Sequence, residues 1–391
     1  MGEQTILPGT AANGQHATLG VMGGGQLGRM FVHAAQRLGY HTAVLDPDPA
    51  SPAGLVSHVH IQTDYQDAQG LAEMVLCCAA ITTEFENVPA DAMRTLAAQR
   101  AVAPAASALR IAQDRIQEKA HFKTCGVPCA PYAVITTPEQ LADVSCALLP
   151  GILKTAQLGY DGKGQVRVAD RAALGAAWAA LKSVPCVLEQ ELALEMECSV
   201  IVARGWDGSM VEFPVQRNLH RVGILAVTEV HAGNLPDALA AQATTAARAI
   251  AKGLEYVGVL CVEFFVVGGG LRVNEMAPRP HNSGHYTIDA CDQSQFDLQV
   301  RTLAGLPLTA PRQHSAAVML NLLGDLWHDA PGGQPDWAAV LALPGTHLHL
   351  YGKSEPRPGR KMGHLTITAD NPGQARAIAD QAAASLGLPP L

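Results

Sequence analysis

The chain has 391 residues, of which 48 % are hydrophobic, 16 % are charged and 5 % are aromatic, and its formal net charge is −8. This length suggests two or three domains, and the hydrophobic content excludes a mainly disordered chain. We expect no binding to nucleic acid, because basic residues form no long run, and no membrane span, because no run of about 18 apolar residues occurs. The N-terminus lacks a signal-peptide pattern, which predicts a cytoplasmic protein, and the nine scattered cysteines indicate neither disulfides nor a zinc site.

The first part of the chain is predicted to form a parallel sheet, because short apolar runs alternate with helical patterns. Strands are expected at three places: 17–22, 42–45 and 79–83. The second strand leads into Asp46 and the third into Glu84 and Glu86. Ligands of open parallel sheets bind at the carboxyl ends of strands, so these acids are candidate binding residues.

Changes in this pattern predict the domain organisation and a combined α/β and α+β fold class. A long helix over 105–125 is predicted to end at Gly126 and Pro128, a stop signal followed by a helix breaker. The following region mixes strands with an Ala-rich helix near 238–252. Four parts are predicted: a leader without an assigned role (1–16), an N-terminal α/β domain (17–125), a central α+β domain (126–310) and a small C-terminal domain (311–391).

Three glycines after the first predicted strand match a dinucleotide-binding pattern. Gly23, Gly25 and Gly28 form GxGxxG, and Asp46 lies 18 residues further on, where a ribose-binding acid is expected. One interpretation is an NAD-dependent dehydrogenase; the other is that the glycines let a strand turn tightly into a helix. The N-terminus of that helix can bind the phosphate of either kind of ligand, so the motif alone does not decide.

A second glycine-rich segment follows Lys154, at the end of another predicted strand. Three glycines occur within the six positions 159–164. Glycines leave backbone N–H groups unhindered, which a loop that closes over phosphates requires. An ordinary hairpin turn is the alternative.

Two apolar segments, 259–267 and 271–276, are separated by three glycines and predict a β-hairpin with a three-residue loop. In that register Glu263 faces Glu275. Two carboxylates whose Cβ atoms lie about 5 Å apart repel each other unless a cation lies between them, and Mg²⁺ is the usual cation beside phosphates. A solvent-facing pair on an edge strand is the alternative, although the apolar neighbours favour burial.

Three further segments carry polar groups that suit ligands. The segment EQEL at 189–192 follows a short apolar strand, where it can meet an adenine and a ribose. The segment RPHNSGH at 279–285 places many donors in one turn, which favours anion binding over a metal site because its two histidines lack an obvious third ligand. Four cations lie within nine residues: Lys353, Arg357, Arg360 and Lys361. Neighbouring prolines and glycines favour a rigid phosphate-binding cluster over a solvated basic loop.

Seven segments together resemble the N5-carboxyaminoimidazole ribonucleotide synthetases, a family of ATP-grasp enzymes of purine biosynthesis. They are spread over nearly the whole chain: GGGQLGRM, LDPDPASPA, TEFENVP, LKTAQLGYDGKGQ, VEFFV, VNEMAPRPHNSGHYT and LHLYGKSEPRPGRKMGHLT. RPHNSGHYT and RPGRKMGHLT are not general ATP-grasp features. The resemblance implies an N-terminal pre-ATP-grasp domain, a central ATP-grasp domain, a small C-terminal domain and a homodimer.

The implied reaction joins 5-aminoimidazole ribonucleotide to bicarbonate with consumption of ATP. Bicarbonate attacks the γ-phosphate to form carboxyphosphate, which carboxylates the exocyclic amine; the products are N5-carboxyaminoimidazole ribonucleotide, ADP and phosphate. ATP and Mg²⁺ are the implied cofactors, with Mn²⁺ as an alternative ion. Such a site has to neutralise phosphate charge and exclude water from a labile anhydride.

The resemblance also implies roles for the residues of each motif. The ATP site is implied to comprise Arg115, Lys154, Gly159, Tyr160, Asp161, Gly162, Lys163, Gly164, Gln165, Glu189, Gln190, Glu191, Leu192, Glu197, His220, Asn274 and Glu275. The implied metal ligands are Glu263 and Glu275. The implied catalytic groups are Tyr160, Asp161, Lys163, Arg279, His281 and Asn282. The ribonucleotide is implied to bind at Gln26, Leu27, Ser283, Lys353, Arg360 and Lys361, so that GGGQLG holds a substrate phosphate rather than NAD.

Three alternatives stay open at this point. Another ATP-grasp carboxylate–amine ligase, such as a formate-dependent glycinamide ribonucleotide transformylase, shares the general machinery. An NAD-dependent dehydrogenase accounts for the GxGxxG pattern but leaves the Glu263 and Glu275 hairpin unexplained. A non-catalytic nucleotide-binding protein is opposed by the full set of catalytic groups.

Overall fold

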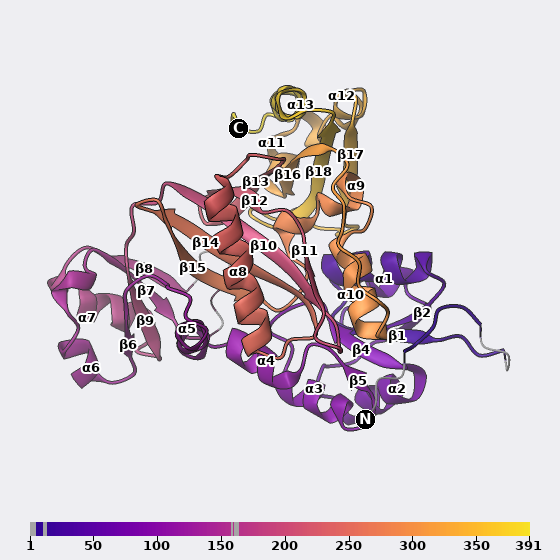
Figure 1. The fold of residues 1–391 in the computed structure, drawn as a ribbon, viewed down its shortest axis with the longest axis horizontal. Helices are drawn as coiled ribbons and strands as arrows, with labels where there is room; N and C mark the ends of the chain where they lie inside the picture. The colour runs from indigo at the N-terminus through magenta and orange to yellow at the C-terminus, as the bar shows by residue number, and fades with distance from the viewer. Residues whose placement is uncertain (1–4, 11–13, 158, 160–163) are drawn as a thin grey trace.

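The computed structural model describes residues 5–10, 14–157, 159 and 164–391, and three β-sheets organise this part of the chain (Figure 1). The N-terminal sheet is parallel, as predicted, with the order β3-β2-β1-β4-β5. Its strands are β1 (Thr18–Met22), β2 (His41–Leu45), β3 (Val59–Ile61), β4 (Ala80–Thr83) and β5 (Ala101–Val102). Leu19 and Val21 of the central strand are fully buried, as expected where helices cover both faces of a parallel sheet. The helices of this part are α1 (Gln26–Arg37), η1 (Gly54–Val56), α2 (Ala68–Cys77) and α3 (Ala90–Ala97).

The prediction of one long helix over 105–125 was wrong. The structure has two helices there, α4 (Ala106–Ala112) and α5 (Arg115–Thr124). Asp114 separates them with an extended backbone. Its Oδ1 accepts hydrogen bonds from the backbone N–H groups of Ile116 at 2.9 Å and Gln117 at 3.2 Å. This N-cap satisfies donors that have no partner within the first turn, so it starts a new helix in a new direction.

The second sheet is antiparallel, with the order β6-β9-β7-β8. Its strands are β6 (Tyr132–Ile135), β7 (Gly151–Thr155), β8 (Gln165–Val168) and β9 (Cys186–Gln190). Helices α6 (Pro138–Ala142) and α7 (Arg171–Ala180), with the short η2 (Cys146–Leu148), accompany it. Leu174 and Trp178 of α7 pack with Leu153 and Leu188 of the strands. This small, separate core places the end of β7, which carries Lys154, beside the end of β9, which carries Glu189.

The third sheet connects the predicted central and C-terminal parts. Its order is β15-β14-β10-β12-β13-β16-β18-β17, with β11 beside β10. Because β13 pairs with β16, this sheet contains strands from both sides of the boundary predicted at residue 310. The domain boundaries themselves stay predictions. Its strands are β10 (Met196–Arg204), β11 (Met210–Glu212), β12 (Gln216–Arg221), β13 (Ile224–Val230), β14 (Gly258–Val267), β15 (Gly270–Ala277), β16 (Ala316–Leu323), β17 (Thr346–Leu350) and β18 (Lys361–Ala369).

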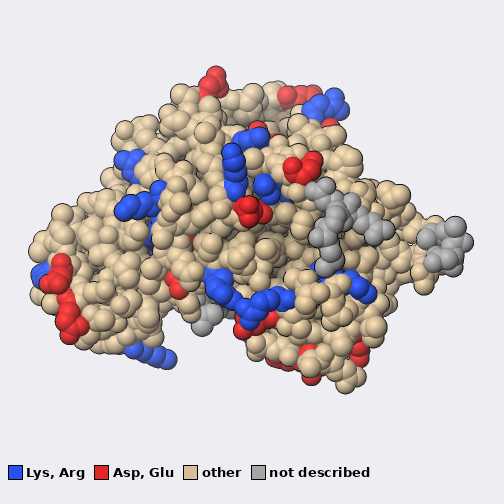
Figure 2. Space-filling view, turned by 60° about the horizontal axis from the view of Figure 1, so that its bottom comes forward, with Lys and Arg blue, Asp and Glu red and all other residues tan. Residues whose placement is uncertain are grey.

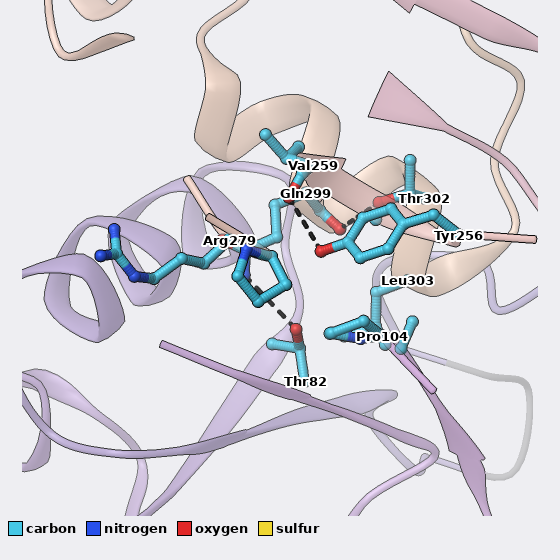
Figure 3. A pocket seen from close by; sticks show the side chains of 11 residues that line it. Thr82, Pro104, Tyr256, Val259, Arg279, Gln299, Thr302 and Leu303 are labelled. Atoms are coloured by element: carbon cyan, nitrogen blue, oxygen red, sulfur yellow. Dashed lines mark hydrogen bonds between the residues drawn. The ribbon is translucent and has the colours of Figure 1, made fainter. Parts of the chain in front are cut away.

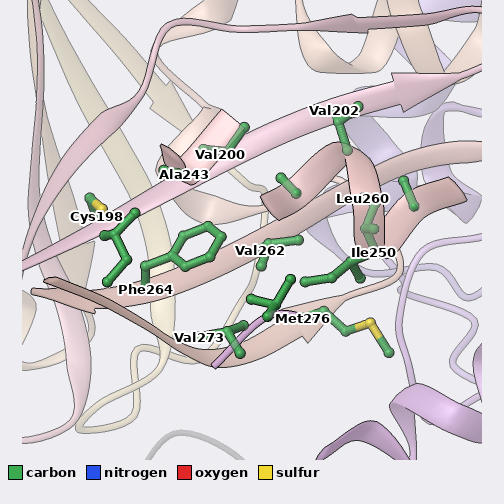
Figure 4. Close-up of a cluster of buried hydrophobic side chains, with 14 of the residues drawn as sticks. Cys198, Val200, Val202, Ala243, Ile250, Leu260, Val262, Phe264, Val273 and Met276 are labelled. Atoms are coloured by element: carbon green, nitrogen blue, oxygen red, sulfur yellow. The ribbon is translucent and has the colours of Figure 1, made fainter. Parts of the chain in front are cut away.

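Helix α8 (Asp237–Gly253) packs across β10, β14 and β15 and encloses the largest apolar cluster of the described residues (Figures 1 and 4). Ala243 and Ile250 of the helix meet Val200, Val262 and Phe264 of the strands. Alanine lets the helix approach the sheet closely, and the branched and aromatic side chains fill the layer between them. This core holds the β14–β15 hairpin in place.

The remaining helices connect and cover these sheets. They are η3 (Asn282–Gly284), α9 (Thr287–Ala290), α10 (Gln295–Ala304), α11 (Asp325–Asp329), η4 (Pro331–Gly333), α12 (Trp337–Leu341) and α13 (Pro372–Ser385). The alanine-rich face of α13 packs against β16 and β18 through Ala375 and Ala379. The predicted combination of α/β and α+β architecture is therefore confirmed. Within the described ranges, no helix is both long and apolar enough to cross a membrane.

Helix α10 attaches the N-terminal sheet to the rest of the molecule. Phe296 and Val300 of α10 share a core with Phe31 of α1. The leader, for which the sequence suggested no role, packs at the same place, because the Ile6 N–H donates to the Ala304 carbonyl at 2.9 Å and the Tyr40 hydroxyl donates to the Ile6 carbonyl at 2.6 Å.

A narrow gap lies between α10 and the N-terminal sheet (Figure 3). The Tyr256 hydroxyl donates to the Val259 carbonyl at 3.0 Å, and Gln299 Nε2 donates to Thr82 Oγ1 at 3.3 Å. The gap has no room for a water-sized molecule. It is a feature of packing between the two parts, not a binding site.

Candidate active site

The β14–β15 hairpin carries Glu263 and Glu275, but its turn differs from the prediction. Val267 pairs with Gly270, so the connection has two residues, Gly268 and Gly269, with φ angles of +57° and +70°. Two consecutive left-handed residues suit glycine, which has no Cβ to clash. The predicted three-residue loop was therefore wrong. A bulge between Val262 and Phe264 shifts the ladder by one residue, and it places Glu263 opposite the stretch that contains Glu275.

Glu263 is a buried carboxyl group beside a second carboxylate, that of Glu275. It is 9 % exposed, and burial, followed by the charge of Glu275, raises the pKa of its carboxyl to about 7. His281 Nε2 lies 3.3 Å from Glu263 Oε1, and Arg115 Nη1 lies 3.2 Å from Glu275 Oε2. Two neighbouring carboxylates with hard oxygen atoms fit a divalent ion such as Mg²⁺, which removes their repulsion.

His220 and Glu197 form a second charged pair beside this hairpin. The His220 Nδ1 atom makes a short contact with the Glu197 carboxylate. Burial by itself lowers the pKa of His220, but the hydrogen bond to Glu197 and the charge of Glu263 outweigh burial and raise this pKa. These two acids therefore favour the protonated form of His220, whose positive charge is balanced within the pair by the Glu197 carboxylate.

Lys119, Lys154 and Glu189 form a buried charge triad where α5, β7 and β9 meet. The two lysine Nζ atoms each lie 2.8 Å from one carboxylate oxygen of Glu189. Burial opposes ionisation of Glu189, but the charges of Lys154 and Lys119 lower the pKa of its carboxyl to about 2. The triad holds the Lys154 ammonium group near the end of β7, the strand that precedes the glycine-rich loop.

Glu118 of α5 supplies a testable pH effect. It is 3 % exposed and accepts a hydrogen bond from the Met276 N–H at 2.8 Å. Burial raises its pKa from 4.5 to about 8, so its ionisation costs stability as pH rises between these two values. We expect Glu118→Gln, which keeps an acceptor oxygen, to become more stable relative to wild type by about 1.4 kcal/mol for each pH unit in this range.

Thermal unfolding of both proteins between pH 5 and pH 8 measures this effect. Glu73→Gln, at an exposed position on α2, is the control. If the difference in unfolding free energy between Glu118→Gln and wild type stays constant with pH, Glu118 ionises in the folded protein as an ordinary glutamate does.

The segment 279–283 follows β15 and leads from the carboxylates to the N-terminal domain. Arg279 pairs with Glu86 at the carboxyl end of β4. Burial opposes ionisation of the Glu86 carboxyl, but the charge of Arg279 outweighs burial and lowers the pKa of Glu86 to about 2. His281 Nδ1 lies 2.9 Å from Ser283 Oγ. Burial and the charge of Arg279 lower the pKa of His281 well below its usual value, so this ring is neutral.

Asn282 has an unusual position within this segment. It is 6 % exposed, and neither its amide oxygen nor its amide nitrogen has a hydrogen-bond partner among the described residues. A buried amide without partners costs free energy, of about 1–3 kcal/mol per unsatisfied group. Such a group is suited to a small polar ligand that supplies the missing hydrogen bonds.

The first glycine-rich motif is held by two carboxylates of its own domain. Asp46 Oδ2 accepts from the Gly24 N–H at 2.7 Å, and the Glu84 carboxylate accepts from Gly25 at 2.7 Å and Gly28 at 2.9 Å. Asp46 therefore holds the loop in place through this hydrogen bond. The interpretation of Asp46 as a ribose ligand of NAD was wrong. Glu84 accepts from two N–H groups at the start of α1, and Gln26 and Leu27 belong to the same first turn, whose N–H groups have no partner within the helix.

The basic segment 353–361 lies near this loop. Burial raises the pKa of Glu84, and the charge of Lys353 opposes part of this rise. The charge of Lys361 likewise opposes part of the rise in the pKa of Glu263. Lys353 Nζ donates to the Lys361 carbonyl at 2.7 Å, and Arg360 Nη1 donates to the Glu355 carbonyl at 2.8 Å. Figure 2 shows lysine and arginine side chains on both sides of a hollow in the middle of one face. Arg279 and Lys361, which lie far apart along the chain, both act on the His281 ring, where their charges add to burial in lowering its pKa.

Comparisons with known proteins agree with this geometry. Three family models match in succession: a ribonucleotide synthetase preATP-grasp domain over 16–113, an ATP-grasp domain over 120–296 and a phosphoribosylaminoimidazole carboxylase C-terminal domain over 317–378. The N5-carboxyaminoimidazole ribonucleotide synthase of Brucella melitensis biotype 1 is 44 % identical over 358 residues, which cover 90 % of this chain and 96 % of the relative. The chain belongs to the N5-carboxyaminoimidazole ribonucleotide synthase family.

Solved structures of this family have the same fold. The ADP complex of one N5-carboxyaminoimidazole ribonucleotide synthetase has a TM-score of 0.89 and 37 % identity, covering 99 % of this chain and 98 % of its own. The Aspergillus clavatus enzyme, in complex with ADP and 5-aminoimidazole ribonucleotide, has a TM-score of 0.86 and 31 % identity, covering 95 % and 98 %. As a member of this family, the protein is an ATP-dependent ligase with ATP-grasp architecture, and the alternative of an NAD-dependent dehydrogenase is wrong.

Several of the residues that the family resemblance implied have a clear place in the structure. Gly164 has a φ of +73°, and its carbonyl accepts from the Thr155 N–H at 2.9 Å, while Lys154 pairs with Gln165 across the β7–β8 hairpin. Gln190 ends β9. Arg167 lies 3.0 Å from Glu191. The other implied members of this region that the structure describes are Gly159, Leu192 and Asn274. Tyr160, Asp161, Gly162 and Lys163 lie outside the described residues.

The sequence did not predict Glu118 and Lys119, and it indicated Glu84 and Glu86 only as candidate binding residues at a strand end. Glu118 and Lys119 are buried on α5, and Glu84 and Glu86 follow β4. The position of Glu84 and Glu86 at a strand end was a usable signal. For Lys119 the signal was weaker, because only the fold shows that this face of α5 meets Glu189.

Proposed function

We propose that this protein carboxylates 5-aminoimidazole ribonucleotide with bicarbonate and ATP, releasing ADP and phosphate. The observation that carries the proposal is the setting of Glu263. Its carboxylate interacts with Glu275, with His281 of the segment 279–283 and with Lys361 of the basic segment. These interactions support a single site for a metal ion, bicarbonate and a ribonucleotide phosphate.

Each group of residues has a defined task in this proposal. Lys154, held by Glu189, binds the phosphates of ATP, and Arg279 and Asn282 orient bicarbonate for attack on the γ-phosphate. Glu263 and Glu275 hold Mg²⁺, or Mn²⁺ in its place, which supplies neutralisation of phosphate charge when bound. The amine nitrogen of the ribonucleotide then attacks the carboxyl carbon of carboxyphosphate, and phosphate leaves.

The loop 159–165 fits the task of covering the reacting groups. It begins a few residues after Lys154, and its glycines allow the backbone to approach phosphates closely. Tyr160, Asp161 and Lys163 of this loop are proposed to act beside Arg279 and His281. Exclusion of water by such a cover protects carboxyphosphate from hydrolysis.

An ADP-release assay in which each substrate is omitted in turn tests the proposed reaction. We expect full turnover only with ATP, bicarbonate and 5-aminoimidazole ribonucleotide together. ADP release that needs formate and glycinamide ribonucleotide instead would identify the other type of ATP-grasp ligase. ADP release with none of these acceptors would contradict both functions.

Arg360→Ala tests the site proposed for the ribonucleotide phosphate. Removal of one charge-assisted hydrogen bond to phosphate costs about 1.5–3 kcal/mol, so we expect the KM for the ribonucleotide to rise by about 10-fold to 100-fold. The KM for ATP changes much less. Arg312→Ala, at an exposed position, is the matched control, and equal rises of both KM values in Arg360→Ala would count against the assignment.

We further propose that the protein acts in the cytoplasm and that it forms a homodimer, as the family resemblance implies. Light scattering of the purified protein tests the assembly. A mass of twice that of one chain supports a dimer, and the mass of a single chain contradicts it.

A further inference from the structure

A cluster of histidines lies where the β17–β18 hairpin meets α9, outside the site proposed for the reaction. We call Asp289, His347, His349 and His364 the histidine cluster. His349 and His364 are direct partners in the antiparallel ladder. Their rings are stacked, with centroids 4.5 Å apart and planes within 11° of parallel. Their side chains therefore lie on the same face of the sheet.

Asp289 of α9 faces this pair. Its Oδ2 lies 2.8 Å from His349 Nε2, and its Oδ1 lies 3.7 Å from His347 Nδ1. One ligand atom each from Asp289, His349 and His364 can be chosen so that all three lie within 4.8 Å of one another. Three residues from three elements thus converge on one small volume.

His364 has a nitrogen that the protein itself does not satisfy. The ring is fully buried, and its Nδ1 lies 2.9 Å from the Tyr351 hydroxyl. Its Nε2 is buried and has no hydrogen-bond partner within the part of the chain that the structure describes. When Nδ1 carries the proton and donates to Tyr351, the lone pair on Nε2 is available, which is the usual arrangement of a metal-ligating histidine.

We propose that Asp289, His349 and His364 bind a transition-metal dication of the Zn²⁺ class, at a site separate from Glu263 and Glu275. Two imidazole nitrogens and one carboxylate oxygen are a typical three-residue ligand set for zinc, with water as a fourth ligand. His347, close to Asp289, is a further nitrogen within reach. Mg²⁺ is disfavoured here, because it prefers oxygen ligands.

Binding requires the His349 ring to turn out of its stacked position on His364, because two parallel rings do not both direct a nitrogen lone pair at one ion. Asp289 and His349 exchange their direct hydrogen bond for bonds to the ion. The three ligand atoms contract from within 4.8 Å of one another to about 3.4 Å, the separation in a tetrahedron with bonds of about 2.1 Å. The bound ion ties β17 and β18 to α9, which follows the segment 279–285 in the chain. The site therefore connects the C-terminal strands to the part of the molecule that carries Arg279.

Cobalt titration of the metal-free full chain tests this proposal directly. Co²⁺ replaces Zn²⁺ in such sites, and its visible absorption reports nitrogen ligation. The titration is done with excess Mg²⁺, which occupies the carboxylate site. We expect one Co²⁺ per chain, displaced by one Zn²⁺, and at least a tenfold weaker affinity in Asp289→Asn and in His349→Gln. Both positions are partly exposed, so these variants avoid the fully buried His364.

Two controls make the outcome specific. His58→Gln alters a different histidine stack, formed by His16, His41 and His58, and Glu263→Gln alters the proposed magnesium site. Both should leave the cobalt spectrum and stoichiometry unchanged. The proposal is overturned if the wild type shows no nitrogen-ligated cobalt spectrum, if Asp289→Asn and His349→Gln bind like the wild type, or if His58→Gln removes the spectrum. None of these readouts depends on the ligase reaction.

Discussion

Glu275→Gln is expected to lose most of its turnover while keeping its fold. The substitution replaces a charged oxygen of the proposed metal site by a neutral amide of the same size. Turnover should fall by about 100-fold or more, which corresponds to about 2.7 kcal/mol of lost transition-state stabilisation. The concentration of Mg²⁺ needed for half-maximal activity should rise, because the variant has one carboxylate fewer for the ion.

The fold should survive this change because Glu275 is not a packing residue. Its side chain is 43 % exposed, and a glutamine can still accept a hydrogen bond from Arg115. Glu212→Gln on β11 is the matched control, since it removes the same charge from a pair with Arg248 at 2.6 Å and Glu212 has no role in the proposed reaction. Steady-state assays over a range of Mg²⁺ concentrations compare the two. Near-normal turnover of Glu275→Gln at ordinary Mg²⁺ would refute the metal assignment.

Glu189→Gln is expected to have the largest effect on stability. It leaves Lys119, which is 1 % exposed, and Lys154 without the carboxylate that lies 2.8 Å from each of them. Removing one partner of a buried ion pair typically costs about 3–5 kcal/mol, because the other charge stays buried without compensation. We also expect a higher KM for ATP, since Lys154 loses the group that positions it.

Thermal unfolding at several pH values measures this contribution. The pKa of Glu189 is lowered to about 2 in the folded protein, so its stabilising effect is complete above the usual glutamate value of about 4.3 and is lost as pH falls toward 2. The difference between wild type and variant should therefore shrink in acid. Glu229→Gln, which removes a carboxylate paired with Arg376, is the control. A Glu189→Gln variant as stable as wild type at neutral pH would contradict the role of the triad.

Local sequence signals identified many elements of the fold because each such signal lies within a few neighbouring residues. The strand that carries Lys154, the Ala-rich helix α8 and the hairpin with Glu263 and Glu275 all follow from short apolar patterns with clear boundaries. The two wrong predictions, of one helix over 105–125 and of a three-residue hairpin loop, also arose from local patterns. Asp114 lies inside a helical pattern, so its role as an N-cap was missed, and the glycines before Leu271 allowed two loop lengths that differ by one residue.

Charge pairing could not be predicted in this way, because the partners are far apart along the chain. Arg279 and Glu86 are separated by 193 residues, and Lys119 meets Glu189 only because α5 packs against β9. Similarly, the GxGxxG pattern could not show that Glu84 and Asp46 already occupy three of its N–H groups. A motif defines which groups are available, whereas the fold decides which of them are already used.

The sequence by itself determined the family, the α/β and α+β architecture and the residue types of an ATP-dependent ligase, since these depend on short motifs and their order. Only the tertiary structure decided the buried triad at Glu189, the bulge at Glu263, the unpartnered amide of Asn282 and the histidine cluster around Asp289. The physical reason is that burial and the distance between charges set their pKa values and their need for a partner, and both quantities arise only when distant elements pack together.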